Sequence, residues 1–251
     1  MTVWEPSPPQ ASLGTNSVDL WRVALDVEPD CQAALGDLLS SQETQQARRF
    51  QFERDRRRYL VSHAALRTIL SQYLNCDPHA VHYQVSSYGK PSLKGRTDLH
   101  FNLAHSHELA LIAVTMLGEI GVDIEYIRGL DGIDQLARVC FSEQEYQQFR
   151  ALPDHEGMHA FFHCWARKEA YIKALGQGLS HPLQRFSVTV LPTQPSRLVT
   201  IDGSADEAAK WTLQSVDVGV EYTAAFAVRA TSVKAQCWNM QFNSELAHVS
   251  C

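Results

Sequence analysis

A short segment near the middle of the chain, EIGVDIE at 119–125, is the feature that most constrains the fold. Its apolar residues stand at every second position, which is the period of a β-strand. The same period places Asp123 and Glu125 together on the other face of the strand. Two such carboxylates can bind one hard cation, because their oxygens point into the same small volume. The alternative is that both simply face water on a half-exposed strand.

A second segment, at 154–176, has the apolar spacing of a core-facing helix. Its apolar stripe consists of Met158, Phe161, Phe162, Trp165 and Ile172. Glu169 falls on this stripe, where desolvation of its charge is costly without a partner, although it can alternatively form a surface pair with Lys173. Carboxylate oxygens suit Mg²⁺, which completes its shell with water and phosphate oxygens. Asp123, Glu125 and Glu169 therefore predict a metal site for phosphate chemistry.

Composition limits the class of protein. A chain of 251 residues with 45% hydrophobic residues can form one large domain or two small ones. A formal net charge of −6 argues against a general nucleic-acid binder. No apolar run is long enough for a membrane helix, and the first residues, MTVWEPSPPQ, do not resemble a signal peptide. The six cysteines follow no disulfide or C-x-x-C pattern, so we expect reduced thiols in a soluble, cytoplasmic protein.

The order of the predicted elements is helix followed by strands, and it occurs twice. Helices are predicted at 40–74, possibly interrupted, and at 131–151 and 154–176. Strands are predicted at 18–26, 81–86, 99–104, 109–117, 120–126, 186–191, 211–217 and 222–229. We therefore expect an α+β fold with a loose lead-in at 1–17, an N-terminal lobe at 18–127 and a C-terminal lobe at 128–251. Because the candidate metal ligands come from both halves, the site is expected between the lobes.

Several motifs together resemble those of a known family. GVDIE at 121–125, followed by WARKEAYIKALGQGL at 165–179, is similar to the paired signature of the 4′-phosphopantetheinyl transferases. FNLAHS at 101–106, YGKP at 88–91 and the basic stretch at 54–58 match further motifs of the family, and the resemblance spans roughly residues 40–190. The chain looks like the Sfp-type, in which two similar α+β lobes are fused into a pseudo-dimer with coenzyme A in the cleft between them. That resemblance implies a monomer.

The resemblance also implies an activity and its partners. Enzymes of this family transfer the 4′-phosphopantetheine arm of coenzyme A to a serine of an apo acyl, peptidyl or aryl carrier protein. The transfer depends on Mg²⁺ and releases 3′,5′-ADP. The carrier can belong to fatty acid, polyketide or nonribosomal peptide biosynthesis. Neither a nucleic acid nor a membrane is an expected partner.

The resemblance assigns roles to individual residues. Asp123, Glu125 and Glu169 match the metal ligands, while Lys90, Lys168, Lys173 and His105 match groups that contact the phosphates of coenzyme A. Arg58 matches a cation near the adenosine end. The candidate catalytic residues are Glu169, Lys173, His105 and Glu145, with Glu169, Glu145 or a metal-bound water as the proton acceptor. Glu145 follows Ser142 by three positions and can instead be a capping-box residue.

One motif departs from the family pattern. The usual sequence FN-[LI]-S-H-S has Ala104 in place of its first serine. If that serine helps to hold a phosphate, its absence weakens coenzyme A binding or requires another donor.

Two other functions compete with the transferase. His155, Glu156 and His159 satisfy the H-E-x-x-H pattern of zinc peptidases, and His163 extends the row. Against this, Phe162 occupies the glycine position of the extended motif, and His155 lies at the predicted start of a helix. The other alternative is a module that binds coenzyme A or a carrier protein without catalysis, which the complete set of carboxylates argues against.

Overall fold

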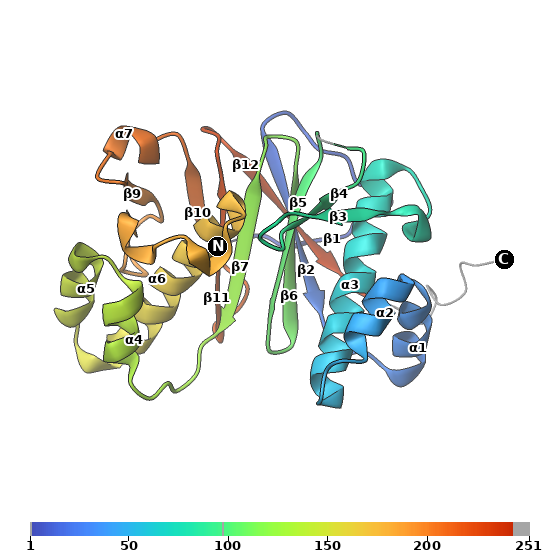
Figure 1. Ribbon diagram of the computed structural model, residues 1–251, viewed down its shortest axis with the longest axis horizontal. Helices are drawn as coiled ribbons and strands as arrows, with labels where there is room; N and C mark the ends of the chain where they lie inside the picture. Colours follow the sequence, from blue (N-terminus) through green and yellow to red (C-terminus); the bar gives the residue numbers. More distant parts are fainter. Residues whose placement is uncertain (1, 97, 243–251) are drawn as a thin grey trace.

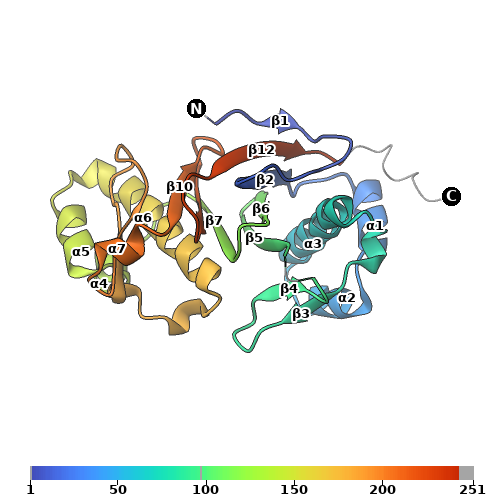
Figure 2. The same ribbon diagram turned by 90° about the horizontal axis from the view of Figure 1, so that it is seen from above.

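The computed structural model describes residues 2–96 and 98–242, which form two lobes that meet along two β-sheets (Figures 1 and 2). The strands are β1 (Glu5–Pro6), β2 (Ser17–Ala24), β3 (Tyr83–Val85), β4 (Pro91–Leu93), β5 (His100–Ser106), β6 (Leu109–Thr115), β7 (Ile120–Tyr126), β8 (Phe186–Val188), β9 (Leu198–Ile201), β10 (Thr212–Val216), β11 (Tyr222–Val228) and β12 (Lys234–Met240). A five-stranded sheet has the order β1-β12-β2-β6-β5, and a three-stranded sheet has the order β10-β11-β7. Two small hairpins, β3-β4 and β8-β9, complete the strands.

Each lobe packs one long helix against its sheet. The helices are α1 (Pro29–Asp37), α2 (Ser41–Ala47), α3 (Glu53–Leu74), α4 (Ile133–Cys140), α5 (Glu143–Arg150), α6 (Asp154–Leu175) and α7 (Ala205–Ala208). Short 3₁₀ turns lie at Pro78–Ala80, Gly178–Ser180 and Leu183–Arg185. Figure 1 shows α1–α3 beside the five-stranded sheet and α4–α6 beside the three-stranded one. Within the described residues, no helix is long and apolar enough to cross a membrane.

Capping explains where the predicted helical regions divide. Ser40 and Glu43 form the predicted capping box at the start of α2, and Asn75 ends α3 in the left-handed conformation with φ 49°. The single helix predicted at 131–151 is wrong. Ser142 takes an extended conformation and caps the N-terminus of α5, where its side chain accepts a hydrogen bond from the N–H of Glu145. The region therefore splits into α4 and α5.

The strand pairing does not follow the predicted division at residue 127. β7 precedes that boundary yet pairs with β11, and β12 follows it yet pairs with β2. The chain therefore passes from one sheet to the other before β7 and returns before β12. β1 also lies inside the predicted loose lead-in, where it pairs with β12. Each lobe has its own apolar core, and a third cluster between the sheets joins them.

Candidate active site

Close packing of α6 on β7 brings the candidate carboxylates together. A Cβ atom built on Gly121 would lie 2.1 Å from the carbonyl oxygen of Ala170 and 2.2 Å from the nitrogen of Ala174. Only a glycine allows the two backbones to approach so closely. The alternation predicted for β7 is confirmed, because its isoleucine and valine side chains are buried in the cluster between the sheets. Asp123 of β7 and Glu169 of α6 consequently share one interface.

Asp123 is buried and forms an ion pair with a lysine of α6. The residue is 4% exposed, and its Oδ1 accepts a hydrogen bond of 2.6 Å from Lys173 Nζ. Its Oδ2 is buried with no hydrogen-bond partner in the described part of the chain. Burial raises the pKa of Asp123, while Lys173 and the backbone N–H of Ile124 act in the opposite direction. An oxygen without a partner is available to a cation.

Glu125 has both carboxylate oxygens held by neighbours. Trp165 Nε1 donates to Oε1 at 3.0 Å, and Ser106 Oγ donates to Oε2 at 3.3 Å. Burial and the charge of Asp123 raise the pKa of Glu125, and these hydrogen bonds partly offset the rise. A cavity of about 200 Å³ adjoins Glu125, with an apolar lining that includes Leu136, Phe161 and Phe162.

Glu169 is the most perturbed of the three carboxylates. Burial raises its pKa to about 7, with further repulsion from Asp123 and Glu125 and a compensating attraction to Lys173. Its Oε1 is buried and has no hydrogen-bond partner among the described residues. Burial thus raises the pKa values of all three carboxylates, and repulsion between them adds to the rise at Glu125 and Glu169.

The donor set fits a hard divalent cation. Two unpartnered carboxylate oxygens and a third carboxylate held by a tryptophan and a serine offer only oxygen ligands, which Mg²⁺ prefers. In the described parts of the chain, no three His, Cys, Asp or Glu side chains already converge as a preformed metal site. The ammonium group of Lys173 supplies the positive charge beside Asp123 instead. The metal assignment of Asp123, Glu125 and Glu169 therefore stays a prediction that the chemistry of the site supports.

Two predicted phosphate contacts lie beside the carboxylates. Burial lowers the pKa of Lys173, but Asp123, Glu169 and Glu125 raise it by more, so the ammonium form is favoured. His105 is exposed at the end of β5. Desolvation is the main cause that lowers the pKa of His105. The positive charges of His63, Lys173 and Arg58 lower it further. Lys173 therefore supplies a positive charge next to the three carboxylates, whereas the lowered pKa of His105 favours its neutral form.

Arg58 and Lys90 are engaged with the protein itself. Arg58 Nη2 donates to Glu108 Oε1 at 2.7 Å. The Nε of Arg58 is buried and has no partner in the described residues. Lys90 Nζ pairs with Glu119 and donates to the carbonyl oxygens of Ile120 at 3.1 Å and Ala174 at 3.0 Å. Lys90 therefore ties the β3-β4 hairpin to the end of α6. It would have to exchange these partners to reach a phosphate.

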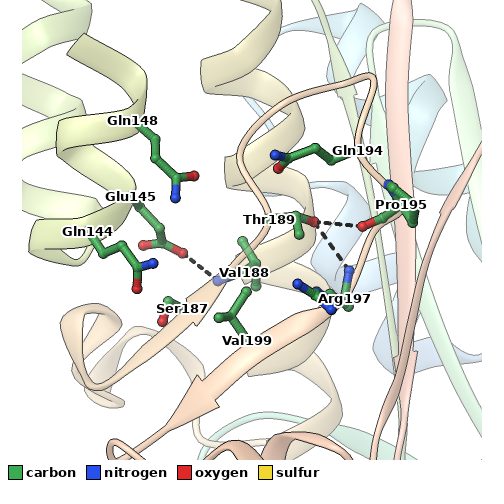
Figure 3. A pocket seen from close by; sticks show the side chains of 10 residues that line it. All are labelled: Gln144, Glu145, Gln148, Ser187, Val188, Thr189, Gln194, Pro195, Arg197 and Val199. Carbon is green, nitrogen blue, oxygen red and sulfur yellow. Dashed lines mark hydrogen bonds between the residues drawn. The ribbon is translucent and has the colours of Figure 1, made fainter. Parts of the chain in front are cut away.

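The structure does not bring Glu145 and Lys168 to the site. Lys168 is fully buried, and its Nζ donates to Glu145 Oε2 at 2.7 Å and to the carbonyl oxygen of Phe186 at 2.9 Å. Glu145 Oε1 also accepts from the N–H of Val188, beside a cavity of about 330 Å³ between α5 and the β8-β9 hairpin (Figure 3). The predicted roles of both residues do not fit this placement, because a buried lysine with such partners cannot contact a ligand. Their pair joins α5, α6 and β8.

Ala104 also differs from its expected role. The residue is 6% exposed, and its methyl group packs in the apolar cluster between the two sheets. A serine at this position would place its hydroxyl at the junction of the sheets. The expectation that Ala104 costs the protein a phosphate contact is therefore not supported by the structure.

The histidines of HEGMH do not form a metal centre. His155 is 80% exposed in its side chain and lies on the first turn of α6. His163 Nδ1 bonds Thr223 Oγ1 at 2.9 Å, and burial lowers its pKa to about 4. No metal cluster involving them occurs among the described residues.

Sequence reasoning missed Ser106 and the polar role of Trp165. The apolar stripe predicts only a packing role for Trp165. Its spacing carried a usable signal, since Trp165, Glu169 and Lys173 recur at every fourth position and must share one face of α6. Ser106 is the last residue of β5, and no local pattern there indicates a contact with β7.

Comparisons with known proteins show the family of the chain. The model of the 4′-phosphopantetheinyl transferase superfamily matches residues 119–227, and the model of a 4′-phosphopantetheinyl transferase N-terminal domain matches residues 28–117. The 4′-phosphopantetheinyl transferase HetI of Nostoc sp. is 38% identical over 240 residues, which cover 94% of this chain and 98% of HetI. The 4′-phosphopantetheinyl transferase Sfp of Bacillus subtilis is 33% identical over 150 residues, which cover 60% of this chain and 66% of Sfp. The chain belongs to the 4′-phosphopantetheinyl transferase superfamily and is an enzyme with Sfp-type relatives.

Proposed function

We propose that this enzyme transfers the 4′-phosphopantetheine arm of coenzyme A to a serine hydroxyl of an apo acyl, peptidyl or aryl carrier protein. The bond between the β-phosphorus and the α,β-bridging oxygen breaks, and 3′,5′-ADP leaves. The observation that carries the proposal is the cluster of Asp123, Glu125 and Glu169 beside Lys173. Its unpartnered carboxylate oxygens and adjacent cation suit a diphosphate with a bound metal.

Asp123, Glu125 and Glu169 would hold Mg²⁺, which when bound neutralises charge on the diphosphate oxygens. The chain itself supplies further positive charge through Lys173, while His105 can donate a hydrogen bond to a phosphate oxygen as a neutral imidazole. A phosphoryl transition state spreads negative charge over its oxygens, so a preorganised ammonium beside them lowers the barrier. Lys173 is preorganised because Asp123 already fixes its Nζ.

Glu169 is the residue we propose as the proton acceptor for the attacking serine. Its Oε1 is buried with no partner among the described residues, so this oxygen is available to accept a proton. The cavity beside Glu125 gives room for a substrate group next to the carboxylates. Arg58 adds a second positive charge, toward the adenosine end of coenzyme A.

We further propose that the enzyme acts as a cytoplasmic monomer, since both lobes of the site come from one chain. The direct test is to incubate the protein with coenzyme A, Mg²⁺ and a panel of apo carrier proteins, followed by mass spectrometry of each carrier. The proposal expects one added phosphopantetheine group on at least one carrier and none without Mg²⁺. If no carrier in a broad panel is modified while the protein is folded and binds coenzyme A, the molecule is a binding module instead.

A further inference from the structure

The two sheets meet along their edge strands, β5 and β7. β5 ends the five-stranded sheet and β7 ends the three-stranded one, and the two strands lie side by side in both ribbon views (Figures 1 and 2). The outward backbone groups of an edge strand need partners when they are buried. The junction between the lobes therefore has to satisfy the amides of β7 that face β5.

Side chains of β5 satisfy two of those amides, at Val122 and Tyr126. The N–H of Ile127 donates to Glu221, so alternate amides of β7 point toward β11 and those of 122, 124 and 126 point toward β5. The N–H of Val122 donates to Asn102 Oδ1 at 2.8 Å, and the N–H of Tyr126 donates to Ser106 Oγ at 3.0 Å. Both contacts join residues 20 positions apart, which gives the two strands one parallel register.

Ser106 has a second contact that Asn102 lacks. A hydroxyl can accept through its lone pairs and donate its single proton. Because Ser106 Oγ accepts from Tyr126, its proton is free to reach Glu125 Oε2 at 3.3 Å. This distance is long for two oxygens, and such contacts often shorten when a ligand occupies the site. Trp165 holds the other oxygen of the same carboxylate.

We infer that Ser106 is a positioning residue, which orients Glu125 toward the metal and thereby couples the docking of the lobes to metal binding. The inference rests on the proposed function. Ser106 belongs to the five-stranded sheet, whereas Glu125 belongs to the three-stranded sheet and Trp165 to the helix α6 that packs on it. Only when the lobes are docked are both oxygens of Glu125 held.

The test compares Ser106→Ala with Asn102→Ala, since both remove one acceptor from the same junction but only the first removes a contact to Glu125. The measured quantity is the dissociation constant of Mn²⁺, followed by electron paramagnetic resonance in the presence of coenzyme A and without a carrier protein. Thermal unfolding is recorded for each variant. Ser106→Thr retains the hydroxyl and serves as the rescue variant.

Ser106→Ala is expected to weaken Mn²⁺ binding about fivefold, the scale of one modest hydrogen bond to a charged group. Asn102→Ala is expected to lower the unfolding midpoint yet leave Mn²⁺ binding within about twofold of wild type, and Ser106→Thr to restore it to the same margin. If Ser106→Ala does not fold, Ser106→Cys, a weaker donor of similar size, is expected to weaken Mn²⁺ binding in its place.

Two results overturn the inference. One is unchanged Mn²⁺ binding in Ser106→Ala or, where that variant does not fold, in Ser106→Cys. The other is an equal loss in Asn102→Ala, which means that the junction acts only as general support. If wild-type protein itself binds no Mn²⁺ beside coenzyme A, the metal role in the proposed function fails, and with it the inference.

Discussion

At the scale of single residues, the site concentrates charges that the fold does not neutralise. Asp123 and Glu169 each keep a buried oxygen without a partner among the described residues, and only Lys173 provides a nearby countercharge. Burying carboxylates in this way costs stability, because they lose water and repel one another. The buried pair of Glu145 and Lys168 shows the contrast, since each of its charged groups has several partners.

The raised pKa of Glu169 predicts an unusual pH dependence of the stability of the metal-free protein. The pKa of Glu169 is raised to about 7 in the folded state, from an ordinary value of 4.5. The folded state therefore keeps a proton that the unfolded state releases, so this carboxyl reduces stability as pH rises from about 4.5 to 7. Glu169→Gln should flatten that slope and stabilise the metal-free protein at pH 7.5 by on the order of 2 kcal/mol.

The measurement is urea unfolding of both proteins in chelator at pH 5 and pH 7.5. Equal slopes with pH for wild type and Glu169→Gln would show that Glu169 titrates normally.

Ala104 gives a second prediction at this scale. Its methyl group packs between the sheets, opposite the part of β7 that contains Ile124. Ala104→Ser should leave the KM for coenzyme A within about twofold, because the new hydroxyl does not face a phosphate. The stability change should stay within about 1 kcal/mol, since the hydroxyl can accept from a β7 amide. A KM lowered by fivefold or more in steady-state assays would restore a phosphate-binding role for this position.

At the scale of elements, the contact of α6 with β7 decides the geometry of the site. The backbones are so close at Gly121 that any side chain there would overlap Ala170 and Ala174. Backbone atoms cannot rotate away as a flexible side chain can, so either the helix moves or the strand does. Since α6 carries both Glu169 and Lys173, a shift of the helix separates them from Asp123.

Gly121→Ala should therefore destabilise the protein by about 3 kcal/mol and reduce transfer at least tenfold in the fraction that folds. Gly129→Ala is the matched control, because a Cβ at Gly129 meets no atom within 4 Å. Chemical denaturation and transfer assays of the two variants test this. Wild-type stability in Gly121→Ala would mean that the helix and strand are not in the close contact described.

The sequence predicted the elements with a strong local period and missed those that depend on distant partners. The alternation in β7 and the apolar stripe of α6 fixed both elements closely. β12 was missed, because its sequence KAQCWNM alternates poorly and its partner β2 lies more than two hundred positions away. Family motifs predicted the carboxylate cluster, which stays a prediction, and they also suggested ligand contacts for Lys168 and Glu145. A motif does not report burial, and both residues are buried as a pair that joins α5, α6 and β8.

At the scale of the whole molecule, the lobes are joined by more than one connection. β7 and β12 each pair with the sheet of the other half of the sequence, and an apolar cluster fills the space between the sheets. The N-terminal segment adds a further link, because Trp4 donates to the carbonyl oxygen of Asp217 at 2.7 Å while β1 pairs with β12.

We therefore expect the two lobes to unfold in one transition, so that tryptophan fluorescence and far-ultraviolet circular dichroism report the same urea midpoint. Separate midpoints would contradict this.

The central claim is that phosphopantetheinyl transfer occurs at Glu169 and its neighbours and not at HEGMH. Mass spectrometry of an apo carrier after incubation with coenzyme A and Mg²⁺ tests it on two folded variants. Glu169→Gln keeps the size of the side chain but removes its charge, and it should reduce the transfer rate by about a thousandfold or more. The double substitution His155→Ala with His159→Ala, ten or more residues earlier on α6, should leave the rate within about threefold, since about 15 Å of helix separates the two clusters. An active Glu169→Gln together with an inactive double histidine variant would contradict the account.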